Sequence, residues 1–399
     1  MKRRRTTLFA AALALSVGLA ALPASRAQTN GAPPQPGASA RFALGGNAAE
    51  IPAEFIGNLV FLPVRLNEGQ PCLFLLDSTA ASTSIDPNRA AELGIRSSES
   101  VVLELAGVAL ALPALPQVPR QNFAAEVGRV YEGTLGKDFF ESVVVEIDYA
   151  RKTVRLYDPA SYQYLGAGKP SHAPAGGAPE VQAKFSETGS KTVEGDFIVN
   201  TAIDVSVLIY ERYADAHRLL ASHLRTIPAM DQPLDERGNA LLARLKLFQI
   251  GAVPVQEPIA EFSRRSPAAG SGARLAGEIG GGMLRRFNVV FDYAHGQIFL
   301  DPNSELHSDE IEDMSGISLI ARGPGLKTFE VAEVRRGTPG SDAGVQKGDI
   351  IAGIDEDPAA DLSLAEIHDL FRQLVRPYKL TIERNGQTLT LTMKLRRLL

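Results

Sequence analysis

The feature that most constrains the fold of this chain is a pattern that occurs twice. An apolar run ends in Asp148-Tyr149-Ala150, and a similar run ends in Asp292-Tyr293-Ala294, 144 residues further on. The motif Gly-x-(Leu/Ile)-Gly precedes both runs, at residues 133–136 and 277–280. Such self-similarity indicates a duplicated structural unit, so the middle of the chain is expected to form two related lobes.

The beginnings of the two copies match as well. Residues 74–79 read Phe-Leu-Leu-Asp-Ser-Thr, and residues 197–202 read Phe-Ile-Val-Asn-Thr-Ala, at an offset of 123. The second copy therefore holds about 21 additional residues in its middle. A short helix is expected after each segment. In the first copy Asp86 is its N-cap, and in the second copy the helix lies near residues 210–220. The other short runs are rich in β-branched residues, which favours strands.

The N-terminus is typical of a secretory signal peptide, predicted at residues 1–27. Basic residues precede an apolar run at 8–22, and small residues follow at the expected cleavage site. We therefore expect a periplasmic or secreted protein without a later transmembrane segment. Retention of the N-terminus as a membrane anchor stays open, although the run is short for a membrane span.

Changes in composition divide the rest of the chain. A Pro- and Gly-rich tether is predicted at 28–40, a similar linker at 164–180 and an acidic linker at 304–313. These segments separate lobe 1 (41–163), lobe 2 (181–303) and a C-terminal module (314–399).

Composition also excludes several classes of site. A net charge of −5 argues against a general nucleic-acid binder. Cys72 is the only cysteine, so no disulfide can form within the chain, and the six His residues are too scattered for a metal site. The glycines at 280–282 lack the spacing of a nucleotide-binding loop. No cofactor or metal is predicted.

The duplicated pattern resembles the pepsin-like and retropepsin-like aspartic peptidases over about residues 50–302. An apolar strand ends in Asp77-Ser78-Thr79-Ala80, and a turn, a short helix and Gly-x-(Leu/Ile)-Gly follow. The resemblance implies a mainly β, two-lobed, acid-protease-like fold (a double-ψ β-barrel) in which each lobe contributes one loop. Asp77 is then the retained catalytic acid and Asn200 occupies the position of the second Asp, with Ser78 and Thr201 beside them.

Aspartic peptidases need two carboxyl groups that share one proton, one acting as base and one as acid. Asn200 cannot ionise, although it can position a water or a carbonyl by hydrogen bonds. The family also has Gly at the position of Thr79. Glycine permits unusual backbone dihedrals there, and a β-branched Thr does not. We therefore expect weak or lost proteolysis, so whether the chain is an enzyme stays open.

Several alternatives remain open. The chain can be an active aspartic endopeptidase that uses Asp77, with the C-terminal module recruiting the substrate. A homodimer that pairs Asp77 with the Asp77 of a second copy is one route to activity. Asp204 is a candidate substitute for the second acid. Asp77 can also be a plain turn residue at the end of a strand.

The C-terminal module resembles bacterial PDZ domains. The resemblance lies in the segment Gly337-Thr338-Pro339-Gly340 and in the residues from Ala343 to Ile351, which read Ala-Gly-Val-Gln-Lys-Gly-Asp-Ile-Ile. Ser363 and Glu366 predict a capping box for a helix at 364–374. Strands at 378–383 and 387–394 are expected to form a hairpin around Asn385-Gly386.

PDZ domains bind a peptide, usually its C-terminus, as an added strand. The resemblance places the peptide between the strand at 316–319 and the helix at 364–374. Backbone N–H groups of Ser315, Gly316 and Ile317 are expected to hold the carboxylate, and an apolar pocket is assigned to Ile317, Leu319, Ile367, Leu370 and Phe371, some of which must serve as core. The predicted partners are peptides or protein C-termini. A scaffold that uses only the PDZ module, with the lobes for dimerisation, remains the third hypothesis.

Overall fold

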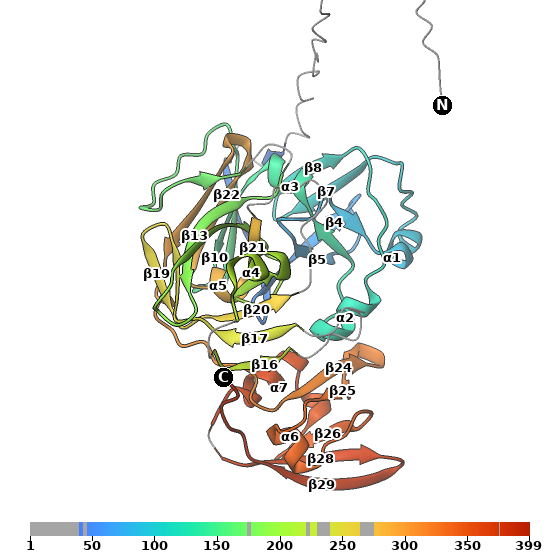
Figure 1. Ribbon diagram of the computed structural model, residues 1–399. Helices are drawn as coiled ribbons and strands as arrows, with labels where there is room; N and C mark the ends of the chain where they lie inside the picture. The colour runs from blue at the N-terminus through green and yellow to red at the C-terminus, as the bar shows by residue number, and fades with distance from the viewer. Residues whose placement is uncertain are drawn as a thin grey trace, which may run out of the picture. The chain divides into compact units, whose positions relative to one another are not determined.

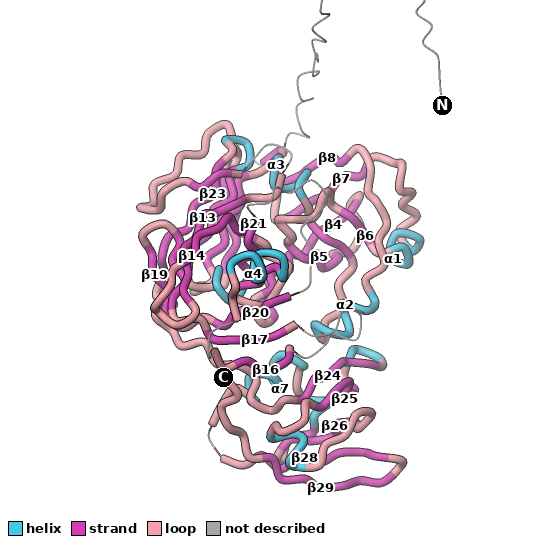
Figure 2. The backbone as a smooth tube through the Cα atoms, in the orientation of Figure 1, coloured by secondary structure: helices cyan, strands magenta, loops and turns pink. Residues whose placement is uncertain are grey.

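The computed structural model describes residues 40–42, 46–173, 177–220, 224–229, 240–263, 275–374 and 376–399. The predicted signal peptide and, apart from Ala40, the predicted tether lie outside these residues. Strands dominate the described chain, so the prediction of a mainly β fold is confirmed (Figures 1 and 2). None of the helices in the described ranges has the length and apolar character needed to cross a membrane.

The described part of lobe 1 contains one eight-stranded sheet and three short helices. Its strands are β1 (Arg41–Phe42), β3 (Glu54–Ile56), β4 (Leu59–Leu66), β5 (Cys72–Leu76), β6 (Ser84–Ile85), β7 (Val101–Leu105), β8 (Val108–Leu112) and β9 (Gly133–Leu135). Its helices are α1 (Pro87–Glu92), α2 (Gln121–Val127) and α3 (Lys137–Ser142). Helix α1 begins as predicted, because the Asp86 carboxylate accepts a hydrogen bond from the backbone N–H of Asn88.

In lobe 2, the strands of the described ranges form a nine-stranded sheet. Its strands are β13 (Glu180–Ser186), β14 (Val193–Val199), β15 (Val207–Tyr210), β16 (Thr226–Pro228), β17 (Leu241–Arg244), β18 (Leu247–Ile250), β19 (Val253–Gln256), β20 (Ile259–Ser263) and β21 (Leu275–Ile279). Its helices are α4 (Glu211–His217) and α5 (Gly281–Leu284).

The two lobes share one strand order. It is β8-β7-β4-β5-β9-β6 in lobe 1 and β19-β18-β13-β14-β21-β15 in lobe 2, with β5–β9 and β14–β21 both parallel. Lobe 2 continues beyond β15 with β20, β17 and β16. Strands β16 and β17 lie between α4 and β18, where lobe 1 passes from α1 to β7 by a short connection. The additional residues of the second copy therefore lie there.

A six-stranded sheet joins the lobes. Its order is β12 (Ser171–His172), β23 (Gln297–Pro302), β22 (Phe287–Asp292), β10 (Val144–Asp148), β11 (Thr153–Tyr157) and β2 (Ala48–Ile51). Strands β10 and β22 pair antiparallel at its centre, and each forms the predicted hairpin, with β11 and β23 respectively. The 3-10 helix η2 (Tyr293–His295) forms the second of these turns. One buried apolar cluster runs through both lobes.

The C-terminal module has its own sheet and its own apolar core. Its strands are β24 (Ile317–Arg322), β25 (Thr328–Val334), β26 (Ile350–Ile354), β27 (Asp357–Pro358), β28 (Tyr378–Arg384) and β29 (Gln387–Met393), and its helices are α6 (Pro339–Ala343), α7 (Leu364–Phe371), η3 (Pro324–Leu326) and η4 (Ala359–Asp361). The capping box at Ser363 and Glu366 is present. Asn385 and Gly386 both have positive φ, as a two-residue hairpin turn requires.

Helix α7 ends three residues before the predicted end. The carbonyl of Leu370 accepts hydrogen bonds from the Tyr378 hydroxyl at 2.7 Å and from the backbone N–H of Gln373 at 3.1 Å. That carbonyl would otherwise serve the next α-helical turn. A contact with Tyr378, eight residues along the chain at the start of β28, therefore accompanies the end of the helix.

The acidic segment 304–313 is bound to lobe 2 along its length. Arg244 donates to the Glu312 carboxylate at 2.9 Å and to the Glu310 carbonyl at 3.0 Å. The Glu310 carboxylate accepts from the Ser206 hydroxyl at 2.7 Å. Glu312 also accepts the backbone N–H groups of Leu398 and Leu399, so this segment ties the C-terminus to the same place.

Candidate functional site

The loops that follow β5 and β14 are joined by reciprocal hydrogen bonds. The backbone N–H of Ser78 donates to Oγ1 of Thr201 at 3.0 Å, and the N–H of Thr201 donates to Oγ of Ser78 at 3.2 Å. The Ser78 hydroxyl donates to the Val199 carbonyl at 2.7 Å, and the Thr201 hydroxyl donates to the Leu76 carbonyl at 2.6 Å. Both side chains are buried. Each loop therefore completes the hydrogen bonding of the other.

This joint brings the residues before Ser78 and Thr201 to the same place between the lobes. The N–H of Asp77 donates to the Leu135 carbonyl at 3.0 Å, and the N–H of Asn200 donates to the Ile279 carbonyl at 2.9 Å. Both acceptors belong to Gly-x-(Leu/Ile)-Gly motifs. Asp77 and Asn200 are therefore corresponding residues of the two lobes.

The last glycine of each motif allows the backbone to pass close to the same loop. A Cβ on Gly136 would lie 2.4 Å from the backbone of Ser82, and a Cβ on Gly280 would lie 2.3 Å from the Val205 carbonyl. Both distances are too short for a side chain, so only glycine fits.

Three hydrogen bonds orient the Asp77 carboxylate. Its Oδ1 accepts from the backbone N–H of Thr79 at 2.8 Å, from the Thr79 hydroxyl at 2.7 Å and from the N–H of Ala80 at 3.1 Å. Thr79 does not have a positive φ, so it carries no left-handed backbone strain in the position where the family has glycine. Its hydroxyl instead adds a donor to the carboxylate.

Asn200 is held by a residue that the sequence motif left unspecified. Its Oδ1 accepts from the N–H of Ala202 at 2.9 Å, and its Nδ2 donates to Oε2 of Glu278 at 2.7 Å. The other oxygen of Glu278 accepts from the Tyr210 hydroxyl at 2.7 Å. Glu278 is the variable position of the second Gly-x-Ile-Gly, where the first copy has Thr134. An acidic residue inside an otherwise apolar strand was the signal that the sequence offered for it.

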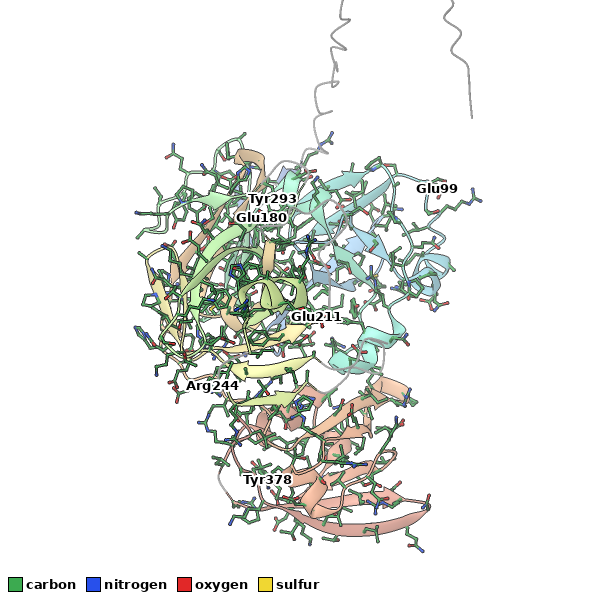
Figure 3. All side chains as sticks on the ribbon, viewed as in Figure 1. Glu99, Glu180, Glu211, Arg244, Tyr293 and Tyr378 are labelled. Carbon is green, nitrogen blue, oxygen red and sulfur yellow. The ribbon has the colours of Figure 1, made fainter. Side chains whose placement is uncertain are left out.

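Two tyrosines lie near Asp77. The hydroxyl of Tyr293, which Figure 3 labels, donates to the Ser78 carbonyl at 2.9 Å. Burial raises the pKa of Tyr293, and the negative charge of Asp77 acts in the same direction. Burial also raises the pKa of Tyr131 to about 12, with a smaller contribution of the same sign from Asp77. Both phenols therefore stay protonated beside the carboxylate at neutral pH.

The other sequence candidates do not join this group. Asp204 accepts hydrogen bonds from the backbone N–H and the side-chain amide of Asn58, at 2.8 and 2.7 Å, so its carboxylate holds a neighbouring turn. His295 lies 2.8 Å from Asp292, and His368 lies 2.8 Å from Asp313. Within the described residues, no group of three or more His, Cys, Asp or Glu side chains is arranged to hold a metal ion.

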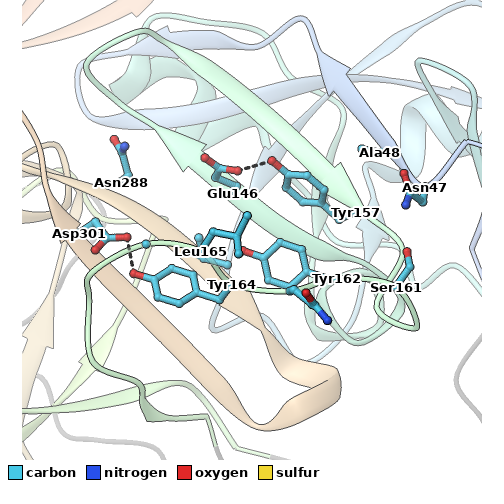
Figure 4. A pocket seen from close by; sticks show the side chains of 13 residues that line it. Asn47, Ala48, Glu146, Tyr157, Ser161, Tyr162, Tyr164, Leu165, Asn288 and Asp301 are labelled. Atoms are coloured by element: carbon cyan, nitrogen blue, oxygen red, sulfur yellow. Dashed lines mark hydrogen bonds between the residues drawn. The ribbon is translucent and has the colours of Figure 1, made fainter.

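A separate pocket of about 530 Å³ lies over the six-stranded sheet (Figure 4). Tyr157 and Tyr164 donate hydrogen bonds to Glu146 and Asp301 within it. Neither Asp77 nor Asn200 lines this pocket. Its two carboxylates are already held by phenol groups.

The predicted carboxylate-binding turn of the C-terminal module precedes β24. The N–H of Ser315 donates to Asp313 at 2.8 Å, and the N–H of Ile317 donates to the Ser315 hydroxyl at 3.1 Å. Two of the three N–H groups assigned to a ligand, with Gly316 as the third, are thus bonded within the chain. The predicted pocket residues fall into two sets: Leu370 is partly exposed, whereas the others are buried in the core, namely Ile317, Leu319, Ile367 and Phe371.

The outer edge of β24 is unpaired, and a helix of lobe 1 lies against this strand. Strand β24 pairs only with β25 among the described strands, and helix α2 packs against it. Leu326, at the end of η3, lines one groove with Ala124 and Tyr131. A Cβ on Gly128 would lie 2.5 Å from Cβ of Leu364, the first residue of α7. Lobe 1 therefore borders the groove in which a PDZ ligand would lie.

Comparison with known proteins gives two positive results. The sequence matches the PDZ domain family over residues 306–383. Among solved structures, an aspartic proteinase from Irpex lacteus is similar, with 12% sequence identity over 65% of this chain and 99% of that chain and a TM-score of 0.42. No curated protein matches the chain in sequence. The C-terminal module therefore matches a PDZ domain. The two lobes before it share one strand order and are joined through the loops that carry Asp77 and Asn200.

Proposed function

We propose that this chain is an exported peptide-binding protein in which the peptidase cycle of two carboxylates is weak or lost. The site of Asp77 and Asn200 between the lobes, called the cleft below, takes an extended peptide, and the PDZ domain takes a peptide or protein C-terminus. The hydrogen bond between Asn200 and Glu278 is the observation that carries the proposal. It puts a fixed amide where the cycle needs a second acid beside Asp77.

The chemistry of that position supports the assignment. Two neighbouring carboxyl groups share one proton because both cannot ionise together, and the shared proton lets them exchange the roles of acid and base. An amide has no proton to exchange at ordinary pH, but it offers two N–H donors and one acceptor. Asp77 and Asn200 therefore suit peptide binding better than this cycle.

Export rests on the predicted signal peptide at residues 1–27, which implies a periplasmic or secreted location. Fractionation of the producing cells checks this location, and finding the chain in the cytosol would refute it.

The shared strand order of the lobes supports an origin of the two lobes by duplication.

Binding by the two sites can be separated with one pair of probes. Fluorescence anisotropy of the full chain is measured with a labelled random octapeptide mixture that has either free or amidated C-termini. Both mixtures are expected to bind, because binding in the cleft does not depend on the peptide C-terminus. The mixture with free C-termini should bind more strongly, because the PDZ domain binds it as well. Failure of both mixtures to bind refutes the proposed function.

The second candidate is an active endopeptidase that uses Asp77. The intact hydrogen bonds of Asp77 favour it, since three donors keep the carboxylate in place. Hydrolysis of an internally quenched peptide library is measured from pH 3 to 7, with Asp77→Ala as the control. Robust cleavage that disappears in Asp77→Ala would establish the enzyme and refute the loss of activity.

A further inference from the structure

Asp77 keeps one acceptor atom, and Asn200 keeps one N–H hydrogen, without a partner among the described residues. Oδ1 of both residues accepts a backbone N–H of its own loop, so Oδ2 of Asp77 and Nδ2 of Asn200 are corresponding atoms. No described residue donates to Oδ2 of Asp77, and Glu278 is the one described acceptor for the two hydrogens of Nδ2. The pair therefore presents one acceptor and one donor.

Glu278 decides which end of the Asn200 amide faces this site. In the opposite orientation, the amide oxygen would lie 2.7 Å from a carboxylate oxygen, and the NH₂ group would face the N–H of Ala202. Both contacts would be repulsive, so the observed orientation is strongly preferred. The Tyr210 hydroxyl holds Glu278 from its other side.

Lobe 1 has no acidic side chain at the position that corresponds to Glu278. The residue that corresponds to Glu278 is Thr134, which is buried and whose Oγ1 has no hydrogen-bond partner among the described residues. A carboxylate such as Asp77 has two equivalent oxygens and needs no such orientation. The acid therefore occurs only in the lobe whose loop carries an amide.

We propose that Glu278 is a positioning residue that makes Asn200 a fixed hydrogen-bond donor, so that Asp77 and Asn200 hydrolyse a peptide bond slowly with a single carboxylate. This inference rests on the proposed function, because it requires a peptide in the cleft. It names a chemistry for that cleft that does not need a second acid.

The steps balance with Asp77 alone. A water molecule gives a proton to Oδ2 of Asp77 while its oxygen bonds to the carbonyl carbon. The electron pair of the C=O bond moves to the carbonyl oxygen, which accepts a hydrogen bond from Nδ2 of Asn200. The C–N bond then breaks, the C=O bond re-forms, and Asp77 returns the proton to the leaving nitrogen. Asn200 stays neutral throughout. The rate therefore follows one ionisation and levels off towards neutral pH, whereas a carboxylate pair gives a bell-shaped profile.

The test measures kcat and KM of the full chain on an internally quenched random octapeptide library from pH 3 to 8. Glu278→Leu is expected to lower kcat by about 10- to 100-fold with KM nearly unchanged, since a misaligned oxyanion donor costs up to about 10²- to 10³-fold. Glu278→Gln keeps one acceptor oxygen and should restore part of the rate. Glu146→Leu is the matched control, because Glu146 is also a half-buried strand residue that accepts from a tyrosine hydroxyl. It should leave both constants unchanged.

Three outcomes overturn the inference. They are no cleavage above the Asp77→Ala background, a bell-shaped optimum in acid, or a Glu278→Leu enzyme that equals the wild type. Anisotropy with the amidated octapeptides shows which proposal has failed. If those peptides still bind in the cleft, only the single-carboxylate chemistry is refuted, and if they do not, the proposed function is refuted as well.

Discussion

At the scale of single residues, Asn200 and Glu278 have to be considered as a pair. Their hydrogen bond is 2.7 Å long and joins an amide to a carboxylate. A change at either residue therefore alters the protonation or orientation of the other. This pairing complicates any attempt to restore a second acid by one substitution.

Asn200→Asp alone is expected to lower stability without creating an acid-active peptidase. It brings two carboxyl groups within hydrogen-bonding distance, so one must take up a proton, and the introduced carboxyl group shares that proton with Glu278 instead of Asp77. We expect a loss of about 1–3 kcal/mol at neutral pH, measured by urea unfolding. Unchanged stability would mean that the two side chains do not interact in solution.

Ser78→Ala tests the joint between the lobes. The change leaves the Thr201 N–H and the Val199 carbonyl without partners in a buried place, so we expect a loss of about 2–4 kcal/mol in urea unfolding. Ser190→Ala is the control, because Ser190 is exposed and its hydroxyl bonds the Thr188 side chain. Equal stability of the two variants would contradict the account of the joint.

At the scale of elements, helix α2 and strand β24 determine access to the PDZ groove. Among the described strands, β24 pairs only with β25, so it has an open edge of the kind that an added peptide strand uses. Helix α2 and the groove around Leu326 occupy part of the surrounding surface. A ligand has to compete with this contact.

Leu326→Ser is therefore expected to increase the affinity of the full chain for peptides with free C-termini. Loss of one partly buried leucine contact weakens the packing of lobe 1 beside the groove by about 1 kcal/mol. If a peptide binds only where this packing has been released, Kd falls roughly fivefold. Anisotropy titration measures the effect, and Leu165→Ser, at a residue that is 91% exposed, serves as control. Weaker binding by Leu326→Ser would show that Leu326 supports the groove and does not restrict it.

Elements with strong local signals were predictable from the sequence. The capping box at Ser363, the Asp86 cap and the Asn385-Gly386 turn all depend on residues close together in the chain, and all are present. Strand β12 was missed because it is short and pairs with β23, which lies far along the chain. The end of α7 was also misplaced, because the Tyr378 hydroxyl, which lies beyond the helix, bonds the carbonyl of Leu370.

The candidate site shows the same division. Asp77 and Asn200 were found because the motif around them occurs twice. Glu278 was missed because its role depends on β21 lying beside β14 in the folded sheet, so that the acid reaches Asn200 from 78 residues away. Repetition shows which positions correspond, whereas the interaction that distinguishes the lobes depends on packing.

At the scale of the whole molecule, the segment 304–313 connects the lobes to the PDZ domain by ionic contacts. Arg244 binds Glu312 on the lobe side, and Asp313 binds His368 of α7 at 2.8 Å. Burial alone raises the pKa of Asp313, but hydrogen bonds from His368 and Ser315 outweigh burial and lower it. The charged form of Asp313 therefore stabilises the folded chain.

The sign of this shift gives a pH prediction. A carboxyl group with a lowered folded pKa contributes stability above its unfolded pKa and loses it as the pH falls through the folded pKa. Asp313→Asn should therefore be less stable than the wild type at pH 5 to 7, and the difference should shrink in acid. Urea unfolding from pH 2 to 7 measures it, and a difference that grows towards low pH would contradict the assignment.

The central claim is that Asn200, an amide fixed by Glu278, takes the place of a second acid beside Asp77. The most direct measurement compares the pH dependence of peptide hydrolysis by the wild type with that of Asn200→Asp/Glu278→Thr, which gives lobe 2 the residues of lobe 1. We predict that the double variant gains a bell-shaped optimum in acid, while the wild type shows at most a slow rate that levels off towards neutral pH. An acid optimum already present in the wild type would contradict the account. So would a double variant whose pH profile is the same as that of the wild type.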